Sequence, residues 1–456
     1  MKTNFFFSLA LFFAVALSQP AGAQIITTVA GNGSTSSSTV VNVPATTTNI
    51  FPGCVATDRY GNFYLAEHYQ VYKVNVHDTI TLVAGTGAAG YSGDGGAATN
   101  ATFSYISGIC VDTAGNLFIA DELNNVIRKV NVVGIVTTLA GTGISGYSGD
   151  GGSATAAMIN SPDDVSADNA GNVYIAEVSN ARIRKVNTAG IITTFAGTGI
   201  IGISGTGGPA TAAKVGALRL TTDSKNNVYI SEGVYVRKID TAGIITIVAG
   251  NGVGAISGTM GNGGPATATG IHCRGITADK AGNIYFTDER FEYVHKVDTA
   301  GFLTIVAGNG YLRNIGMGFT AGGFGGDGGP ATMAMLDYPC DVAVNDSGDI
   351  FICDQNNFRI RKVIAATLVA SNVQHPMLQV ELYPNPAAGS FTVKLPKLIS
   401  AATVALTDIA GRIIEKREVD AGNERTVVFS RQLPAGVYFI LVGTEAGTVS
   451  KQLVVL

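Results

Sequence analysis

Five charged residues occupy positions where a repeated pattern otherwise carries mostly small or apolar residues: Asp163, Asp164, Arg219, Arg274 and Asp341. Each stands four or five positions before a recurrent Asp or Asn. Carboxylates and guanidinium groups gathered in one place hold a polar ligand through charge-assisted hydrogen bonds. We therefore expect these five residues to bind a ligand at the mouth of a central channel. The alternative is that the charges pair with one another and cap strand ends.

A second candidate for chemistry is the acidic residue of the Ser/Gly-Gly-Asp-Gly-Gly segments, which is Asp94, Asp150 or Asp327. Gly-Asp loops offer the oxygen ligands that calcium prefers. Each segment supplies one carboxylate only, and Thr206 and Asn262 replace it in two copies. A short helical turn explains the segments better, with the following Pro at its first position and the preceding Gly at its cap. The sequence predicts no metal site.

Histidines are too few for most kinds of catalytic site. Of five histidines, only His68 and His272 are expected to reach the face that carries the loops, which is too few for a zinc site. An acidic residue ends each predicted second strand in all repeats, so we assign it to the fold: Glu67, Asp121, Glu177, Glu232, Asp288 and Asp354. A catalytic group should break the repeat. We predict no catalytic residue and no cofactor, and favour a binding protein over an enzyme.

The elements that position these residues form a repeat. A Gly-Asn-Phe-Tyr-Leu-Ala-Glu-like heptapeptide begins at Gly61, Gly115, Gly171, Asn226, Gly282 and Gly348. An Asp or Asn stands three positions before each copy, and a Lys/Arg-containing strand follows it. Four short strands in each unit of about 56 residues are typical of propeller blades. The segment Ile25–Gly31 has a fourth-strand sequence, so we expect it to complete the last blade and close a six-bladed ring, residues 24–369.

Composition excludes some classes of protein. The 456 residues carry a net charge of −4, and charged residues make up 14%, against about 25% in an average domain. Binding of nucleic acid through a basic face is therefore not expected. The five cysteines form no Cys-x-x-Cys pair. A bridge between Cys54 and Cys340, in neighbouring blades, is left open.

The ends of the chain indicate export. Residues 1–23 have a charge, a short apolar core and Ala21-Gly22-Ala23, which predict a signal peptide cleaved after Ala23. No transmembrane segment is expected after cleavage. Residues 370–377 are interpreted as a linker, and residues 378–456 as a small β-sandwich.

Two family resemblances rest on these patterns. The run from Ala114 to Asp121, with Ile127-Arg128-Lys129-Val130 and the Gly-Asp-Gly-Gly-x-Ala-Thr insertions, resembles the NHL-repeat propellers of secreted bacterial proteins. Three motifs, Tyr383–Pro386, Leu406–Arg412 and Leu433–Phe439, resemble the type A C-terminal sorting domain of the type IX secretion system of Bacteroidetes. The second resemblance implies that the secretion machinery recognises residues 378–456 and that the protein travels through the periplasm to the cell surface or is released.

Function is expected on one face of the propeller. The glycine-rich insertions all precede innermost strands, so we expect them to crowd the face at the channel mouth, where Tyr91, Tyr147 and Phe324 would stack on a sugar. The leading hypothesis is a binding or scaffold propeller that recognises a protein, peptide or glycan through this loop face. The alternative is a hydrolase or lyase that acts on a small molecule at the channel mouth. The insertions are Gly90–Phe103, Gly146–Ile159, Gly202–Val215, Ala255–Ile271 and Gly322–Leu336, with a Ser/Thr-rich first loop, Ser34–Thr48.

Overall fold

The computed structural model describes residues 24–35, 40–254, 261–311, 313–316 and 319–364 of a first compact unit. Of a second unit it describes 380–385, 387, 390–395, 402–407, 413–420, 422, 425–430, 432–444 and 447–455. The expected signal peptide, residues 1–23, and the linker, residues 370–377, lie outside the described residues.

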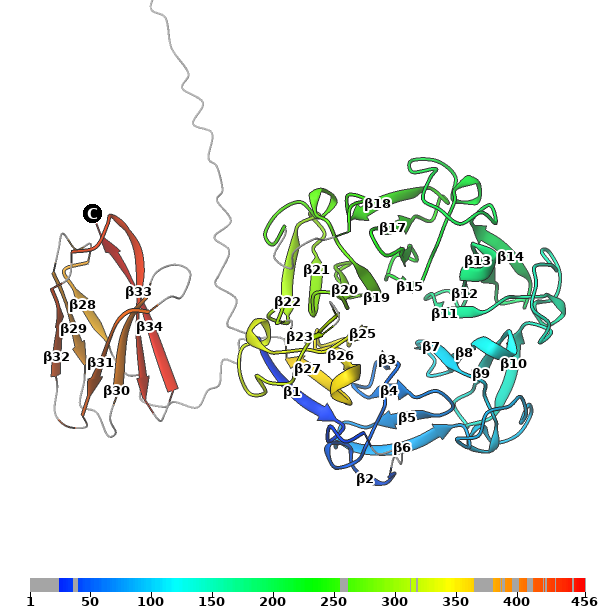
Figure 1. Ribbon diagram of the computed structural model, residues 1–456, viewed down its shortest axis with the longest axis horizontal. Helices are drawn as coiled ribbons and strands as arrows, with labels where there is room; N and C mark the ends of the chain where they lie inside the picture. Colours follow the sequence, from blue (N-terminus) through cyan, green and yellow to red (C-terminus); the bar gives the residue numbers. More distant parts are fainter. Residues whose placement is uncertain are drawn as a thin grey trace, which may run out of the picture. The chain divides into compact units, whose positions relative to one another are not determined.

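The first unit is a ring of six antiparallel sheets around a central axis, so the predicted six-bladed propeller is confirmed (Figure 1). Blade 1 contains β3 (Cys54–Thr57), β4 (Phe63–Ala66), β5 (Val71–Val74) and β6 (Thr79–Ala84), with β2 (Val43–Pro44) beside β6. Blade 2 contains β7 (Ile106–Val111), β8 (Leu117–Asp121), β9 (Val126–Val130) and β10 (Val136–Ala140). Blade 3 contains β11 (Pro162–Ala167), β12 (Val173–Glu177), β13 (Arg182–Val186) and β14 (Ile192–Ala196).

The remaining blades repeat this order. Blade 4 contains β15 (Arg219–Thr222), β16 (Val228–Ser231), β17 (Val236–Ile239) and β18 (Ile245–Ala249). Blade 5 contains β19 (Cys273–Ala278), β20 (Ile284–Asp288), β21 (Tyr293–Val297) and β22 (Leu303–Ala307), and a ribbon of β23 (Arg313–Gly316) and β24 (Phe319–Ala321) follows it. Blade 6 contains β25 (Pro339–Val344), β26 (Ile350–Asp354), β27 (Arg359–Ile364) and β1 (Ile25–Ala30).

The N-terminal strand closes the ring, as predicted. β1 pairs antiparallel with β27, with Ile26 opposite Val363 and Thr28 opposite Arg361. The innermost strands contact one another in the cyclic order β3, β7, β11, β15, β19, β25. Blade 2 therefore lies across the axis from blade 5, and blade 3 across from blade 6.

The recurrent Asp builds the turn between the first two strands of a blade. In blade 3 the Asp168 carboxylate accepts hydrogen bonds from the backbone N–H groups of Ala170 and Asn172, from the Asn172 side chain and from the Tyr174 hydroxyl. Asp58 and Asp223 make the same four contacts. The carboxylate organises the turn in the way that Asx turns do, which explains why most copies of the heptapeptide carry Asn and Tyr at these positions.

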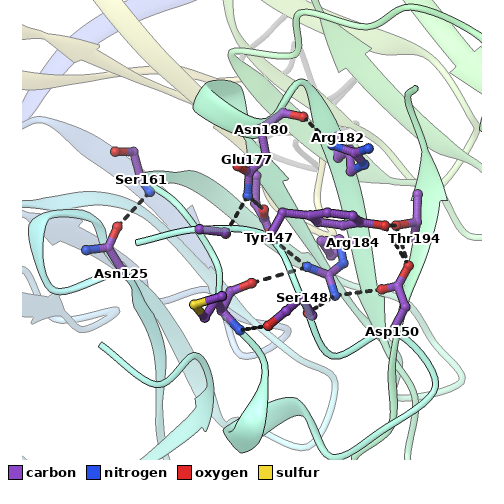
Figure 2. A network of polar contacts seen from close by, with 12 residues as sticks. Asn125, Tyr147, Ser148, Asp150, Ser161, Glu177, Asn180, Arg182, Arg184 and Thr194 are labelled. Atoms are coloured by element: carbon purple, nitrogen blue, oxygen red, sulfur yellow. Dashed lines mark hydrogen bonds and ion pairs between the residues drawn. The ribbon is translucent and has the colours of Figure 1, made fainter. Parts of the chain in front are cut away.

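A buried arginine of the third strand fastens the glycine-rich insertion to its blade. Figure 2 shows blade 3, where the fully buried Arg184 bonds to Asp150 of the insertion at 2.6 Å and to Glu177 of β12 at 3.4 Å. The Tyr147 ring lies 4.9 Å from the Arg184 guanidinium, and the Thr194 hydroxyl donates to Asp150 at 2.7 Å. Arg128 with Asp94 and Arg361 with Asp327 repeat this clamp in blades 2 and 6.

These contacts correct the roles expected for the loop residues. The carboxylates considered as calcium ligands are held by arginine and threonine side chains. Tyr91, Tyr147 and Phe324 cover the buried guanidinium groups. The helical turns are present, but Pro occupies the cap one residue before the first helical residue: η6 (Ala210–Ala212), η7 (Ala266–Ala268) and η8 (Ala331–Met333) follow Pro209, Pro265 and Pro330. Corresponding turns are η1 (Ala45–Thr47), η2 (Ala98–Asn100) and η4 (Ala154–Ala156).

The insertions lie along the outer edges of the blades, and the expectation that they crowd the channel mouth is wrong. In blade 3 the Gly151 N–H donates to the Ile192 carbonyl of the outermost strand at 2.8 Å, and the Ala154 N–H to that of Gly190. The equivalent bonds occur in blades 2, 4, 5 and 6, and β2 takes this place in blade 1. Since an open sheet edge invites pairing with another chain, the insertions protect all six edges.

The recurrent acid at the end of the second strand serves the fold, as predicted. Asp121, Glu232 and Asp354 each accept a backbone N–H from the segment that leads into the innermost strand, at 2.7 to 2.8 Å. A 3-10 turn follows this acid in three blades: η3 (Glu122–Asn124), η5 (Val178–Asn180) and η9 (Gln355–Asn357).

The second unit is a small sandwich of two sheets, as predicted. One sheet has the order β28 (Glu381–Tyr383), β29 (Phe391–Leu395), β32 (Arg425–Phe429). The other has the order β31 (Ile413–Val419), β30 (Ala402–Thr407), β33 (Gly436–Thr444), β34 (Gly447–Val455). Phe391 and Phe429 stack at 5.0 Å and pack with Leu406 and Ile440 in one core.

The clamp leads to a stability prediction. Arg184→Met leaves Glu177 fully buried without its cation, so we expect a loss of about 3–5 kcal/mol in the free energy of unfolding. Asp150→Ala should cost less, about 1–2 kcal/mol, because the Asp150 side chain is 36% exposed. Urea denaturation of the full chain measures both.

The matched control is Arg182→Met. Arg182 packs on the same Tyr147 ring, at 3.8 Å, but bonds only to backbone carbonyls among the described residues. Equal losses for Arg182→Met and Arg184→Met would contradict the buried clamp as the source of stability.

Candidate functional site

Two cavities lie on the propeller axis. The first, here called the mouth pocket, has a volume of about 470 Å³ and is formed where innermost strands begin and second strands end. The second, the lower channel, has a volume of about 410 Å³ and runs along the innermost strands to the Asp turns. The mouth pocket is lined by Gly53, Glu67, His68, Tyr105, Ile106, Ser107, Glu122, Leu123, Asp163, Arg219, Arg274 and Gln355.

The five residues expected at the channel mouth occupy two levels. Asp163, Arg219 and Arg274 line the mouth pocket. Asp164 and Asp341 line the lower channel and are buried, with 8% of each residue exposed. The structure therefore brings three of the five together in one pocket and places two below them.

Each of the five charges has a protein partner, in agreement with the alternative expectation. Arg219 Nη1 donates to the Asp163 carboxylate at 3.0 Å and to the Asp163 carbonyl at 2.6 Å. Arg274 Nη1 donates to Glu289 at 2.8 Å and to the Tyr338 hydroxyl. The Asp164 carboxylate accepts the backbone N–H of Leu220 in the next blade at 2.9 Å, and Asp341 accepts that of Val55. The two aspartates thus tie innermost strands to each other.

Glycine allows these carboxylates to approach. A Cβ at Gly108 would lie 2.2 Å from an Asp164 carboxylate oxygen, and a Cβ at Gly275 would lie 2.5 Å from the Asp341 Cα. No side chain fits at such distances. The glycines of blades 2 and 5 are therefore required by the aspartates of blades 3 and 6.

Burial controls the charge state of this layer. It raises the pKa of Asp164 to about 7, while Arg219 acts in the opposite direction and Asp341 adds to the rise. Burial also raises the pKa of Asp341, again opposed by Arg219. Arg219 Nε is buried and has no hydrogen-bond partner among the described residues.

Further residues surround the mouth pocket, and of these only His68 was expected on this face from the sequence. The residue after each recurrent acid differs from blade to blade: His68, Glu122, Val178, Gly233, Glu289 and Gln355. Three of them, His68, Glu122 and Gln355, line the pocket, and Glu289 binds Arg274. The sequence contains a signal for these residues, because the residue type varies at this position whereas the position before it is always Asp or Glu.

Two tyrosines at the mouth adopt an unusual backbone conformation. Tyr105 and Tyr338 precede innermost strands with φ of 66° and 56°, the left-handed region that bulky residues rarely enter. The Tyr105 ring stacks on His68 at 5.2 Å. Ser161, at the equivalent position of blade 3, has a φ of 43°, so this conformation recurs in three blades and belongs to the fold.

The described residues hold no group of three or more His, Cys, Asp or Glu side chains placed to bind a metal ion. His272 lies outside the lining of the mouth pocket, and its Nδ1 is buried without a hydrogen-bond partner. Cys54 and Cys340 are both buried free thiols, so the bridge left open by the sequence is not formed.

Comparisons with known proteins agree with this architecture. The secretion system C-terminal sorting domain family matches residues 381–456, and the NHL repeat family matches residues 336–363. The teneurin NHL domain family matches residues 80–148 and 143–204. The chain is an NHL-repeat propeller with a secretion sorting domain. Its sorting domain directs it, through the type IX secretion system, to the cell surface or beyond.

Relatives of this NHL propeller are mostly longer proteins. Teneurin-1 of Gallus gallus is 29% identical over 262 residues, which cover 53% of this chain and 9% of teneurin-1. The chloroplastic protein SUPPRESSOR OF QUENCHING 1 of Arabidopsis thaliana is 28% identical over 373 residues, covering 77% of this chain and 34% of that protein. The chain thus spans about a third or less of these two relatives.

Solved structures share the fold. An auxiliary nutrient binding protein from Bacteroides ovatus has a TM-score of 0.53 at 14% identity, covering 75% of this chain and 76% of that one. A protein of unknown function from Bacteroides thetaiotaomicron has a TM-score of 0.51 at 17% identity over the same shares. Among the described residues of the NHL propeller and its sorting domain, no helix is long and apolar enough to cross a membrane.

The buried carboxylates give the NHL propeller a pH-dependent stability. The pKa of Asp164, about 7 in the fold, exceeds the value of about 3.9 of an unfolded chain. The folded state therefore binds an extra proton between these values, and the free energy of unfolding falls as pH rises through this window. Asp164→Asn should make the free energy of unfolding decrease less steeply with pH, by up to about 1.4 kcal/mol per pH unit. Urea denaturation from pH 4.5 to 8 measures it.

The control for this experiment is Asp346→Asn, an aspartate with a 41% exposed side chain near the end of the lower channel. It should leave the pH dependence as in the wild type. The prediction is wrong if Asp164→Asn and the wild type lose stability equally between pH 4.5 and 8.

Proposed function

We propose that this exported propeller is a binding protein whose ligand occupies the mouth pocket. The observation that carries the proposal is that residues which break the repeat converge there. Asp163, Arg219 and Arg274 come from the innermost strands, and Glu122 and His68 come from second-strand ends. Residues that obey the repeat stabilise the blades. The residues that depart from the repeat gather in one cavity, and most of the other blades have different residues at these positions.

The structure changes the surface that we assign to recognition. The insertions expected to form a broad binding face are bonded to the outer strands and clamped by buried arginines. A cavity of about 470 Å³ lies within the range of about 300–1,000 Å³ typical of small-ligand sites. The proposal is therefore a ligand, or a ligand end, that enters the axial pocket, with the protein either released or held at the cell surface.

A hydrolase or lyase acting in the same pocket is the second candidate. It is supported by the presence of Glu122, Asp163 and His68 in one cavity, because carboxylates and histidine are the usual general acids and bases. Incubation of a bound compound with the protein, followed by mass spectrometry, distinguishes the two functions. Conversion of the compound favours the enzyme, and recovery of the intact compound favours the binding protein.

Binding through the mouth pocket predicts a specific loss in variants. The full chain is screened on peptide and glycan arrays, and its ligands are retested with Arg274→Met and Asp163→Asn. Each substitution removes a charge that faces the pocket, so we expect affinity to fall about tenfold or more, the value of one hydrogen bond to a charged group. Titration calorimetry measures the change.

The matched control is Arg59→Met, because Arg59 lies at the far end of the channel and is fully exposed at its charged group. It should bind as the wild type does. Array ligands that bind Arg274→Met and Asp163→Asn with unchanged affinity would place recognition elsewhere on the protein.

A further inference from the structure

The mouth pocket has an acidic side and a basic side. Glu122 and Asp163 belong to blades 2 and 3, whereas Arg219 and Arg274 belong to blades 4 and 5. Because blade 2 lies across the axis from blade 5, Glu122 and Arg274 line opposite walls. The pocket thus presents charges of both signs to whatever enters it.

On each side a charged group lacks a full set of partners. The Glu122 carboxylate makes no hydrogen bond or ion pair with a residue that the structure describes, and it experiences the charges of Asp163 and Arg219. Among the residues that the structure describes, Arg219 makes its hydrogen bonds through Nη1 only, to Asp163. Its Nε is buried without a partner among these residues, and its side chain is 7% exposed. Protein atoms cover this Nε, so an anion in the pocket would approach the remaining donors of Arg219 and those of Arg274, which both line the pocket.

A flat apolar surface lies beside Glu122, on the acidic side of the pocket. Tyr105 is 40% exposed, and its ring is stacked on His68 with an interplanar angle of 25°. Leu123, next to Glu122, is 63% exposed. An aromatic ring held in place by a strained backbone offers a face for another ring or for an apolar side chain.

We propose that the mouth pocket binds a zwitterion of amino-acid or dipeptide size that carries an aromatic or apolar side chain. This inference rests on the proposed binding function and names the class of ligand. The ammonium group lies at Glu122, the carboxylate at Arg219 and Arg274, and the side chain against Tyr105. Burial and the Asp163 charge raise the pKa of the Glu122 carboxyl, and an ammonium group beside it would lower that pKa again.

Asp163, Arg219 and Arg274 already have protein partners, and other ligand classes would add a partner on one side of the pocket only, or on neither. A neutral glycan or an internal peptide segment would satisfy neither charge. A simple anion would face Glu122 and Asp163, and a simple cation would face Arg219 and Arg274. Only a ligand with both charges neutralises both sides when water is displaced.

Titration calorimetry of the full chain with four probes tests the proposal. L-phenylalanine and glycyl-L-phenylalanine carry both charges, N-acetyl-L-phenylalanine lacks the ammonium group, and L-phenylalaninamide lacks the carboxylate. We expect both zwitterions to bind and each singly charged analogue to bind about tenfold more weakly. Comparison of the affinities for L-phenylalanine and glycyl-L-phenylalanine shows whether the pocket prefers a free amino acid or a dipeptide.

Two variants link each charge to its partner. Glu122→Gln should weaken the binding of L-phenylalanine, so that L-phenylalanine no longer binds more tightly than N-acetyl-L-phenylalanine. Arg274→Gln should also weaken the binding of L-phenylalanine, so that it no longer binds more tightly than L-phenylalaninamide. Arg59→Gln, at the far end of the channel, is the control and should change neither ratio. Unchanged ratios in both pocket variants would overturn the proposal.

The results also separate this inference from the proposed function. If all four probes bind with equal affinity and Arg274→Gln abolishes the binding of all four, the zwitterion proposal is wrong, but a ligand still binds in the mouth pocket. Absence of binding by all four probes overturns the zwitterion as well, and the array ligands then decide whether the mouth pocket binds anything. Array ligands insensitive to Arg274→Met and Asp163→Asn overturn the proposed function itself.

Discussion

A guanidinium group buried between two carboxylates is the interaction on which the blade architecture depends. In blades 2, 3 and 6 it joins the second strand, the third strand and the insertion that covers the outer edge. Removal of the cation leaves an uncompensated charge in a dry interior, so the three segments must stay together. The glycine-rich insertions are consequently part of the framework of these blades.

The variation between blades follows the same constraint. Blade 4 keeps Arg237 and Glu232 but has Thr206 in the insertion. Arg237 holds this insertion through the carbonyls of Ser204 and Lys214, as Arg184 also does through those of Ser148 and Met158. Blade 5 replaces the arginine with His295, whose pKa burial lowers to about 4, so it is neutral at pH 7. Its insertion carries Asn262, which binds a backbone N–H of β22. Where the cation is lost, the insertion's carboxylate is also lost.

The repeat was enough to predict the fold, because strand ends, turn aspartates and blade phase recur at fixed spacing. The placement of the insertions was not predictable from the spacing of the repeat. Spacing shows where a loop begins and ends, but it does not show which edge of the sheet the loop follows. Pairing of Arg128 with Asp94 could have been inferred from their joint replacement in blade 5. For the site, Asp163, Arg219 and Arg274 were found because they break the repeat. His68 was expected on this face, but Glu122 was missed because its neighbour, the recurrent acid Asp121, was treated as the feature of interest.

The closing strand also determines the order in which the ring can be completed. Each of blades 1 to 5 is built from a continuous stretch of chain, so its hairpins form from local contacts. Blade 6 joins Ile26 to Val363, and its insertion reaches back to Gln24 through Ala331. This pairing has the largest sequence separation in the propeller, and contacts of that kind form slowly. Until it forms, β1 and β27 both expose a free edge that another chain could pair with, so closure of the ring also removes a site of aggregation.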